Sequence, residues 1–348
     1  MKTIFVTGST KVIMPEQGSC KASKLLSILQ LGAIKITFNP KADYLLSIDH
    51  NKSAYKEFIK GGGTPERAFL LRLEPPSVFP AQYRHSIESK YGTIFTPGSI
   101  LVRSKDFIGW PYQIHADPNS PTYSVDGIEN FVAPSNIDYE EWCHRELFLA
   151  MIAANKVAPT LGQNYALRRK FAKNLKSPDF HLFGVLWNES FRLKLRHRLA
   201  VSYFAIRQGT RPNIISIYGN LLNRYPRSLG SAQDKHLILK NSKFSLIIEN
   251  SDTYVSEKLF DSLINGCIPV YFGPELDRAQ ISKELVISYN GSPNNLIQTL
   301  ANLSDSEIQS KLNAIAKFLS SDSFKNTWFE SNVYENIAKM MMSRMKNI

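Results

Sequence analysis

The sequence contains little cysteine and no long hydrophobic run. Its three cysteines, Cys20, Cys143 and Cys267, lie far apart and match no zinc-ligand spacing. An odd number of scattered cysteines predicts reduced thiols and not a disulfide framework. No window approaches the roughly 18 apolar residues of a membrane span, and the start, MKTIFVTGST, has too short an apolar run for a signal peptide. These absences predict a soluble, cytoplasmic protein, with peripheral contact to the inner face of a membrane left open.

The composition gives no sign of disorder. The 348 residues are 43% hydrophobic and 21% charged, which is ordinary for a globular protein, and the length suffices for two domains with a full core each. The net charge of +12 comes from 42 Lys and Arg against 30 Asp and Glu. Such an excess attracts nucleotide sugars, nucleic acid, anionic lipid head groups and acidic glycans alike. Charge alone therefore does not select the partner.

The stretch KFSLIIENSDTYVSEKLFDSLINGCIPVYFGP reads as one unit of strand, helix and strand. Residues 244–248 form a compact run of branched apolar residues, which predicts a buried parallel strand, and residues 268–272 predict a second one. Asp252 or Thr253 can cap the intervening helix. Gly266 stands where a left-handed residue ends such a helix.

Polar residues gather where this first strand ends and the helix begins: Asn250, Ser251, Tyr254, Glu257 and Lys258. A right-handed crossover brings the carboxyl end of the strand and the amino end of the helix to one crevice, where phosphorylated ligands bind. Lys258 adds a positive charge to the helix dipole. The pattern predicts a diphosphate site. For Glu257 taken alone, the alternative is an ordinary acidic residue, which the helix dipole favours in the first turn of a helix.

This stretch resembles the signature of the α-1,3-fucosyltransferase family (glycosyltransferase family 10). The matching segments are FSLIIENS, YVSEK and IPVYFG, in register across the unit. Two departures are a Ser at position 256 in place of the usual Thr and a short spacer between Ser251 and Tyr254. The resemblance implies an inverting transfer of fucose from GDP-fucose to a hydroxyl of a glycan acceptor.

Strands alternate with helical patterns along the whole chain, which predicts an α/β fold with parallel sheets. The resemblance implies two Rossmann-like doubly wound domains facing a cleft, the GT-B type. We expect an acceptor-side domain over residues 1–145, a domain that binds the GDP-sugar over residues 146–325, and an amphipathic C-terminal helix over residues 326–348. We expect the Met-rich face of this helix to pack back on the N-terminal domain, with a membrane surface as the alternative.

A second, shorter match surrounds Glu74. The segment LLRLEPP reads as a strand that stops at two prolines, which places Glu74 at the carboxyl edge of a parallel sheet. Family members carry a Glu-x-Pro element at such a strand end, and its Glu is the proposed general base. A Glu that merely begins a turn is the alternative.

A third match covers LFLAMIAANK, YALRRKFAKNL and FHLFG. It resembles the family's run of strand, Ser-Asn, Arg-led helix and strand, with Ala154 in place of the Ser and Asn155 keeping the Asn. Arg168 then falls at the phosphate-binding Arg of the family, and a guanidinium fork suits a diphosphate. A solvated helix charge is the alternative.

The resemblance also implies roles for the individual residues. Asn250 and Ser251 would donate to the diphosphate, and Tyr254 and Glu257 would contact the fucose, the ribose or both. Glu74 and Glu257 are the expected catalytic carboxylates. The sequence has no Asp-x-Asp pair, so we expect no metal site and no obligatory cofactor beyond the GDP-fucose substrate.

Two other functions stay open. The same scaffold could transfer another nucleotide sugar. Alternatively, the basic insertion at residues 190–212 and the C-terminal helix could bind nucleic acid or an anionic membrane. We do not expect nucleic acid as a partner, and peripheral membrane contact is the alternative that we keep.

Overall fold

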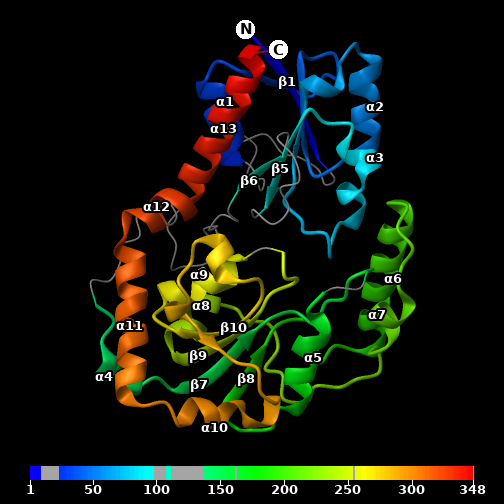
Figure 1. The fold of residues 1–348 in the computed structure, drawn as a ribbon. Coiled ribbons are helices and arrows are strands. Elements are labelled where there is room, and N and C mark those ends of the chain that lie inside the picture. Colours follow the sequence, from blue (N-terminus) through cyan, green and yellow to red (C-terminus); the bar gives the residue numbers. More distant parts are fainter. Residues whose placement is uncertain (9–22, 98–106, 111–135, 161–162, 254, 348) are drawn as a thin grey trace. The chain divides into compact units, whose positions relative to one another are not determined.

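The computed structural model describes residues 1–8, 23–97, 107–110, 136–160, 163–253 and 255–347. The chain divides into two compact units, the first made of Met1–Gln113 with Asn326–Ile348 and the second of Ile114–Lys325. Each has its own parallel sheet covered by helices (Figure 1). The α/β architecture predicted from the alternation of strands and helices is therefore confirmed.

The sheet of the first unit has six parallel strands in the order β2-β1-β3-β4-β5-β6. They are β1 (Thr3–Gly8), β2 (Lys35–Thr37), β3 (Tyr44–Ile48), β4 (Ala68–Leu71), β5 (Thr93–Pro97) and β6 (Phe107–Trp110). The helices of this unit are α1 (Ser23–Leu31), α2 (Lys52–Lys60), α3 (His85–Glu88) and α13 (Glu330–Asn347), with 3₁₀ turns at Pro65–Arg67 and Pro80–Tyr83.

Alternate side chains of these strands fill two cores. Ile4 and Val6 of β1 face the core that α1 and α13 cover, whereas Phe5 faces the core against α2. This period of two is what a strand buried on both faces produces.

The C-terminal helix α13 is part of the first core. Tyr334, Ile337 and Met341 are buried there against α1 and the sheet, and α1 and α13 lie side by side (Figure 1). The hydroxyl of Tyr44 donates to the carbonyl of Met345 at 2.9 Å. The apolar face of α13 is therefore occupied by protein.

The sheet of the second unit has five parallel strands in the order β11-β10-β9-β7-β8. They are β7 (Leu147–Ile152), β8 (Phe180–Phe183), β9 (Ser242–Ile248), β10 (Ile268–Phe272) and β11 (Ile287–Ser288). After β7 the chain adds β8 on one side and then returns to add β9 on the other. The strand order therefore reverses between β7 and β9, and the carboxyl ends of these two strands form the crevice where doubly wound sheets bind ligands.

The helices of the second unit are α4 (Tyr139–Cys143), α5 (Tyr165–Asn174), α6 (Phe191–Arg207), α7 (Ile214–Tyr218), α8 (Lys235–Lys240), α9 (Glu257–Ile264), α10 (Leu296–Ala301) and α11 (Asp305–Ser320), with 3₁₀ turns at Leu276–Ala279, Lys283–Leu285 and Pro293–Asn295. Helix α12 (Asp322–Trp328) contains the division between the units. No helix among the residues that the structure describes is long and apolar enough to cross a bilayer.

Residues 136–145, which we expected to close the N-terminal domain, group with the second unit. The indole of Trp142 donates to the carbonyl of Lys243 at 3.1 Å, and its ring meets Phe244 edge-on. Arg145 donates to two carbonyls of the same unit, those of Ser242 and Gly266, at 2.9 Å each. These contacts attach α4 to the start of β9.

Candidate functional site

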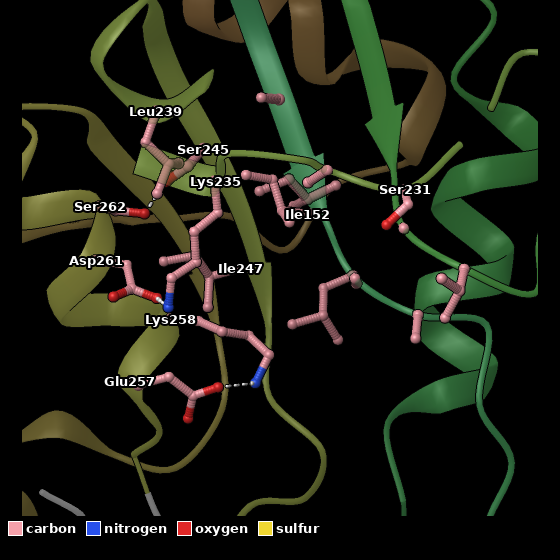
Figure 2. Close-up of a pocket in the computed structure, with 18 residues that line it drawn as sticks. Ile152, Ser231, Lys235, Leu239, Ser245, Ile247, Glu257, Lys258, Asp261 and Ser262 are labelled. Carbon is pink, nitrogen blue, oxygen red and sulfur yellow. Dashed lines mark hydrogen bonds and ion pairs between the residues drawn. The ribbon is translucent and has the colours of Figure 1, made fainter. Parts of the chain in front are cut away.

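A cavity of about 300 Å³ lies at the carboxyl ends of β7 and β9. Side chains of both strands form one part of its wall, and residues directly after β7 and β8 form another. Polar residues from α8, α9 and the segment before α8 line it as well. Figure 2 shows Ser231 on the opposite side of this space from Asp261 and Glu257. The cavity therefore occupies the crevice predicted by the strand order.

Gly184, directly after β8, lines the cavity where two backbone segments come together. Its φ of +130° lies in a region that favours glycine, and a Cβ at this position would stand 2.1 Å from the carbonyl oxygen of Ala153. Only a glycine therefore allows the ends of β7 and β8 to approach this closely.

Helix α9 begins later than the sequence suggested. We expected Asp252 or Thr253 as its cap, but the cap is Ser256, whose hydroxyl accepts from the backbone N–H of Lys258 at 3.4 Å. The C-terminal prediction is confirmed, since Gly266 follows the helix with a φ of +61°. The later start places Glu257 and Lys258 in the first turn, beside the cavity.

The reason for the later start is the fully buried carboxylate of Glu249. Its two oxygens accept from the backbone N–H of Ser256 at 2.8 Å and from the hydroxyl of Ser256 at 2.6 Å. Burial raises the pKa of Glu249, whereas the nearby ammonium of Lys258 and the bonds from Ser256 lower it. Glu249 lies within the matching segment FSLIIENS, but no role was predicted for it, so the residue that holds the cap of α9 was missed.

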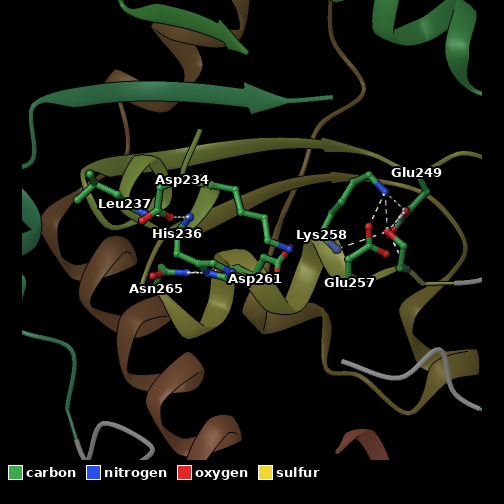
Figure 3. A network of polar contacts seen from close by, with 10 residues as sticks. Asp234, His236, Leu237, Glu249, Glu257, Lys258, Asp261 and Asn265 are labelled. Carbon is green, nitrogen blue, oxygen red and sulfur yellow. Dashed lines mark hydrogen bonds and ion pairs between the residues drawn. The ribbon is translucent and has the colours of Figure 1, made fainter. Parts of the chain in front are cut away.

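Lys258 is the cation of this cluster. Its Nζ lies 3.0 Å from the hydroxyl of Ser256, 3.5 Å from Glu257 and 3.9 Å from Glu249, and its side chain is 22% exposed (Figure 3). A lysine ammonium has three donors, and a hydrogen bond with a charged partner is stronger than a neutral one. Together with the N-terminus of α9, Lys258 can thus bind an anionic group in the cavity.

A second lysine faces the same cavity from α8. The Nζ of Lys235 lies 2.9 Å from the carboxylate of Asp261, a buried residue of α9. Burial raises the pKa of Asp261 to about 6, against the effect of Lys235. Asn265 donates to the Asp261 carbonyl and contacts the ring of His236 (Figure 3). The pair joins residues 26 positions apart, so no local motif could have predicted it.

Arg168 is buried in α5 and is not the solvated charge of our alternative interpretation. Its Nε and Nη2 donate to the carbonyl of Ile248 at 2.9 and 2.5 Å, and Nη2 also donates to the side-chain oxygen of Asn250 at 2.7 Å. The guanidinium therefore fixes the chain at the carboxyl end of β9.

The structure places most of the predicted donor residues in one region. Glu257 and Lys258 line the cavity, while Arg168, Asn250 and Ser251 surround the end of β9 next to it and are not among its lining residues. The hydroxyl of Ser251 bonds that of Thr253 at 2.7 Å. Tyr254, which we predicted to contact the sugar or the ribose, lies outside the described residues.

Glu74 belongs to the first unit, three residues after the end of β4. Its backbone is held on both sides, because its N–H donates to Asp49 at 3.3 Å and its carbonyl accepts from Gln82 at 3.0 Å and from the Tyr83 hydroxyl at 2.8 Å. The same oxygen of Asp49 accepts from Gln82 and from the N–H of Leu73. Glu74 is thus both part of a turn and rigidly placed at the carboxyl edge of its sheet.

Asp49→Asn is expected to flatten the pH dependence of the free energy of unfolding. Burial raises the pKa of Asp49 from 3.8 to about 6, so between these values the folded chain keeps a proton that the unfolded chain has lost. The wild-type free energy of unfolding therefore falls as the pH rises from about 4 to about 6, by up to about 3 kcal/mol from this group. Urea unfolding at several pH values measures the fall.

The D49N variant cannot ionise at this position. Its free energy of unfolding should therefore not show the decrease between about pH 4 and about pH 6 that Asp49 causes in the wild type. Glu57→Gln, which removes an exposed carboxylate of α2, should leave the curve as in the wild type. A D49N curve with the full wild-type slope would show that Asp49 is already ionised in the folded chain below pH 6.

Comparison with known proteins adds to this geometry. No protein-family model matches the chain. Over 102 residues it is 34% identical to an α-(1,4)-fucosyltransferase of Arabidopsis thaliana, and this match covers 26% of the chain and 25% of that protein. The chain thus matches about a quarter of the length of that curated relative.

Solved structures match over nearly the whole chain. Anabaena HepE in complex with UDP superposes with a TM-score of 0.50 at 11% identity, covering 99% of this chain and 100% of that one. An α1,3-fucosyltransferase structure gives 0.46 at 14% identity, covering 99% and 90%. The predicted resemblance to the fucosyltransferases is confirmed over that matching quarter of the chain, and the fold of two Rossmann-like units, the GT-B type, is shared with HepE.

Proposed function

We propose that this chain is an inverting glycosyltransferase that moves fucose from GDP-fucose to a hydroxyl of a glycan acceptor. One observation carries the proposal: Lys258 and the N-terminus of α9 face a cavity at the point where the strand order of the second unit reverses. The sequence match to a fucosyltransferase supports fucose as the sugar.

The second unit would bind the donor. Lys258 and Lys235 line the cavity with Ser231, a chemistry suited to a diphosphate. Arg168 and Asn250, bonded to each other beside it, would act on the same group or hold its binding loop in place. Glu257, which also lines the cavity, and Tyr254 are the candidates for contacts with the fucose or the ribose.

In the proposed reaction the acceptor oxygen attacks the anomeric carbon of fucose from the face opposite the leaving group. The bond from that carbon to the phosphate oxygen breaks, and GDP keeps the electron pair. The acceptor proton passes to the carboxylate of Glu74, the proposed general base. Cations near the diphosphate stabilise the charge that develops on the leaving GDP.

The proposal includes no obligatory divalent ion, since the sequence has no Asp-x-Asp pair. Turnover is then expected to survive a chelator, and loss of turnover that Mn²⁺ restores would overturn this part. We place the activity in the cytoplasm.

A second candidate is the transfer of another nucleotide sugar on the same fold. HepE of Anabaena was solved with UDP, so the fold itself does not select guanine. The choice between the two candidates therefore has to come from a binding measurement.

The test is thermal unfolding with GDP or with UDP. At about 100 times its dissociation constant a ligand stabilises the folded state by about 2.7 kcal/mol, which raises Tm by roughly 5–10 °C for a unit of this size. A shift with GDP and none with UDP supports the proposal, whereas the reverse supports the second candidate. Release of GDP from GDP-fucose in the presence of a panel of glycans then tests the transfer, and no shift with either nucleotide would contradict both.

A further inference from the structure

The second unit carries a cationic and apolar surface that the proposed reaction does not use. Between Glu189 and Asp234 the chain has no acidic residue. The basic residues of this segment are Arg192, Lys194, Arg196, Arg198, Arg207, Arg211, Arg224 and Arg227. We call the exposed side chains of α6, α7 and their connection the α6–α7 surface.

Helix α6 is turned opposite to an ordinary surface helix. Its inner face buries the cationic residues Lys194 and Arg198, and Lys194 donates to the carbonyl of Asn223 at 3.1 Å. Its outer face presents apolar side chains to solvent, with Tyr203 65% and Ile206 63% exposed. The hydrophobic effect favours the reverse arrangement in a helix that meets only water on its outer side.

Helix α7 extends this surface. It lies beside α6 (Figure 1), and the hydroxyls of Ser202 and Tyr218 are 3.1 Å apart across the two helices. Ile215 is 81% exposed. The exposed Arg207 ends α6, and the exposed Arg211 stands in the connection between the helices. Large apolar side chains of both helices thus share this surface with the exposed arginines of α6 and of the connection.

We propose that the α6–α7 surface docks on an anionic lipid membrane. Apolar side chains such as those of Ile206 and Ile215 gain by entering the region between head groups and acyl chains, and arginines pair with anionic head groups at the same depth. This inference rests on the surface alone and does not depend on the proposed sugar transfer.

Two other occupants fit less well. The phosphates of nucleic acid would pair with the arginines. The isoleucines would stay exposed to water, because the phosphate backbone has no apolar layer. In a dimer through this surface, two copies of the same basic segment would face each other. The segment contains no carboxylate, so the positive charges of the two copies would repel. An anionic lipid surface meets both the charge and the apolar side chains.

The test is sedimentation of the full chain with vesicles of phosphatidylcholine and phosphatidylglycerol, and with phosphatidylcholine alone. We expect binding to the anionic vesicles only. Replacing Arg192, Arg196 and Arg207 together by Gln should weaken it about a hundredfold, from about fivefold for each basic residue near the membrane. Ile206→Ser with Ile215→Ser should weaken it by about tenfold.

Matched controls lie on the first unit. Gln at Lys52, Lys56 and Lys60 removes three exposed cations of α2, and Leu31→Ser with Phe38→Ser removes two exposed apolar side chains. Both control variants should bind like the wild type. Because all these side chains are exposed, equal melting temperatures should show that the variants fold.

Several outcomes would overturn the proposal. One is a wild type that stays in the supernatant with anionic vesicles at low salt, and another is an arginine variant that sediments as the wild type does. If the chain binds double-stranded DNA but no vesicles, and the two isoleucine substitutions do not weaken DNA binding, the surface would be assigned to nucleic acid. If the wild type forms a dimer that the two isoleucine substitutions dissociate, the α6–α7 surface would be assigned to a second copy of the chain.

Discussion

Glu74→Gln is expected to lower kcat by about 10²–10⁴ while the affinity for GDP stays within about twofold. A positioned general base contributes a factor of this size, and the amide of Gln cannot accept the acceptor proton. The change should leave the turn in place, because its partners Asp49, Gln82 and Tyr83 bond the backbone of residue 74. Steady-state release of GDP from GDP-fucose measures kcat, and calorimetric titration measures GDP affinity.

Glu57→Gln is the matched control for this prediction, since it removes an exposed carboxylate of the same unit and should alter neither quantity. If E74Q keeps the wild-type kcat, Glu74 is not the general base and is only a residue of the turn. A loss of GDP affinity equal to the loss of kcat would indicate damage to the donor site and not to proton transfer.

The sequence predicted those features of the fold that depend on local pattern. The strand at residues 268–272 occurs with the predicted bounds, and Gly266 adopts the left-handed conformation. Each is set by neighbours in the chain: a run of branched apolar residues between polar ones, or the need for a residue without Cβ.

Contacts between distant residues were beyond sequence reasoning. The start of α9 depends on Glu249 bonding Ser256, which is stronger than the local cap at Asp252 that the pattern favoured. The pairing of Lys235 with Asp261 needs α8 and α9 to lie together. Helix α6 shows the same limit, because burial of Arg198 and exposure of Ile206 reverse the rule by which apolar residues are assigned to the core.

The charges around the cavity bear on how the site would bind the proposed diphosphate. Two lysines, Lys235 and Lys258, face two carboxylates that line the cavity, Glu257 and Asp261. Burial raises the pKa of Asp261 to about 6, and a bound anion would raise it further. Proton uptake at this carboxylate would therefore accompany binding of the diphosphate and make the cavity more positive.

Lys258→Met is expected to weaken GDP binding by roughly 10–150-fold, which is the range for a hydrogen bond to a charged group of about 1.5–3 kcal/mol. Its ammonium lies 3.0 Å from the hydroxyl of Ser256, the cap of α9, and Met keeps the length of the side chain without the charge. The same change removes the positive charge beside Glu249, so the pKa of that buried carboxyl should rise further. Calorimetric titration with GDP measures the affinity.

Lys240→Met provides the control, because this exposed lysine in the last turn of α8 belongs to the same unit but does not line the cavity. Its GDP affinity should equal that of the wild type, and both variants should melt cooperatively. Guanosine, which has no phosphate, separates two causes of weaker binding. If Lys258 acts on the diphosphate, K258M lowers the affinity for GDP and not for guanosine. An equal loss for both ligands would mean that the variant has lost the shape of the α9 start, with Glu249 and Ser256 no longer holding it.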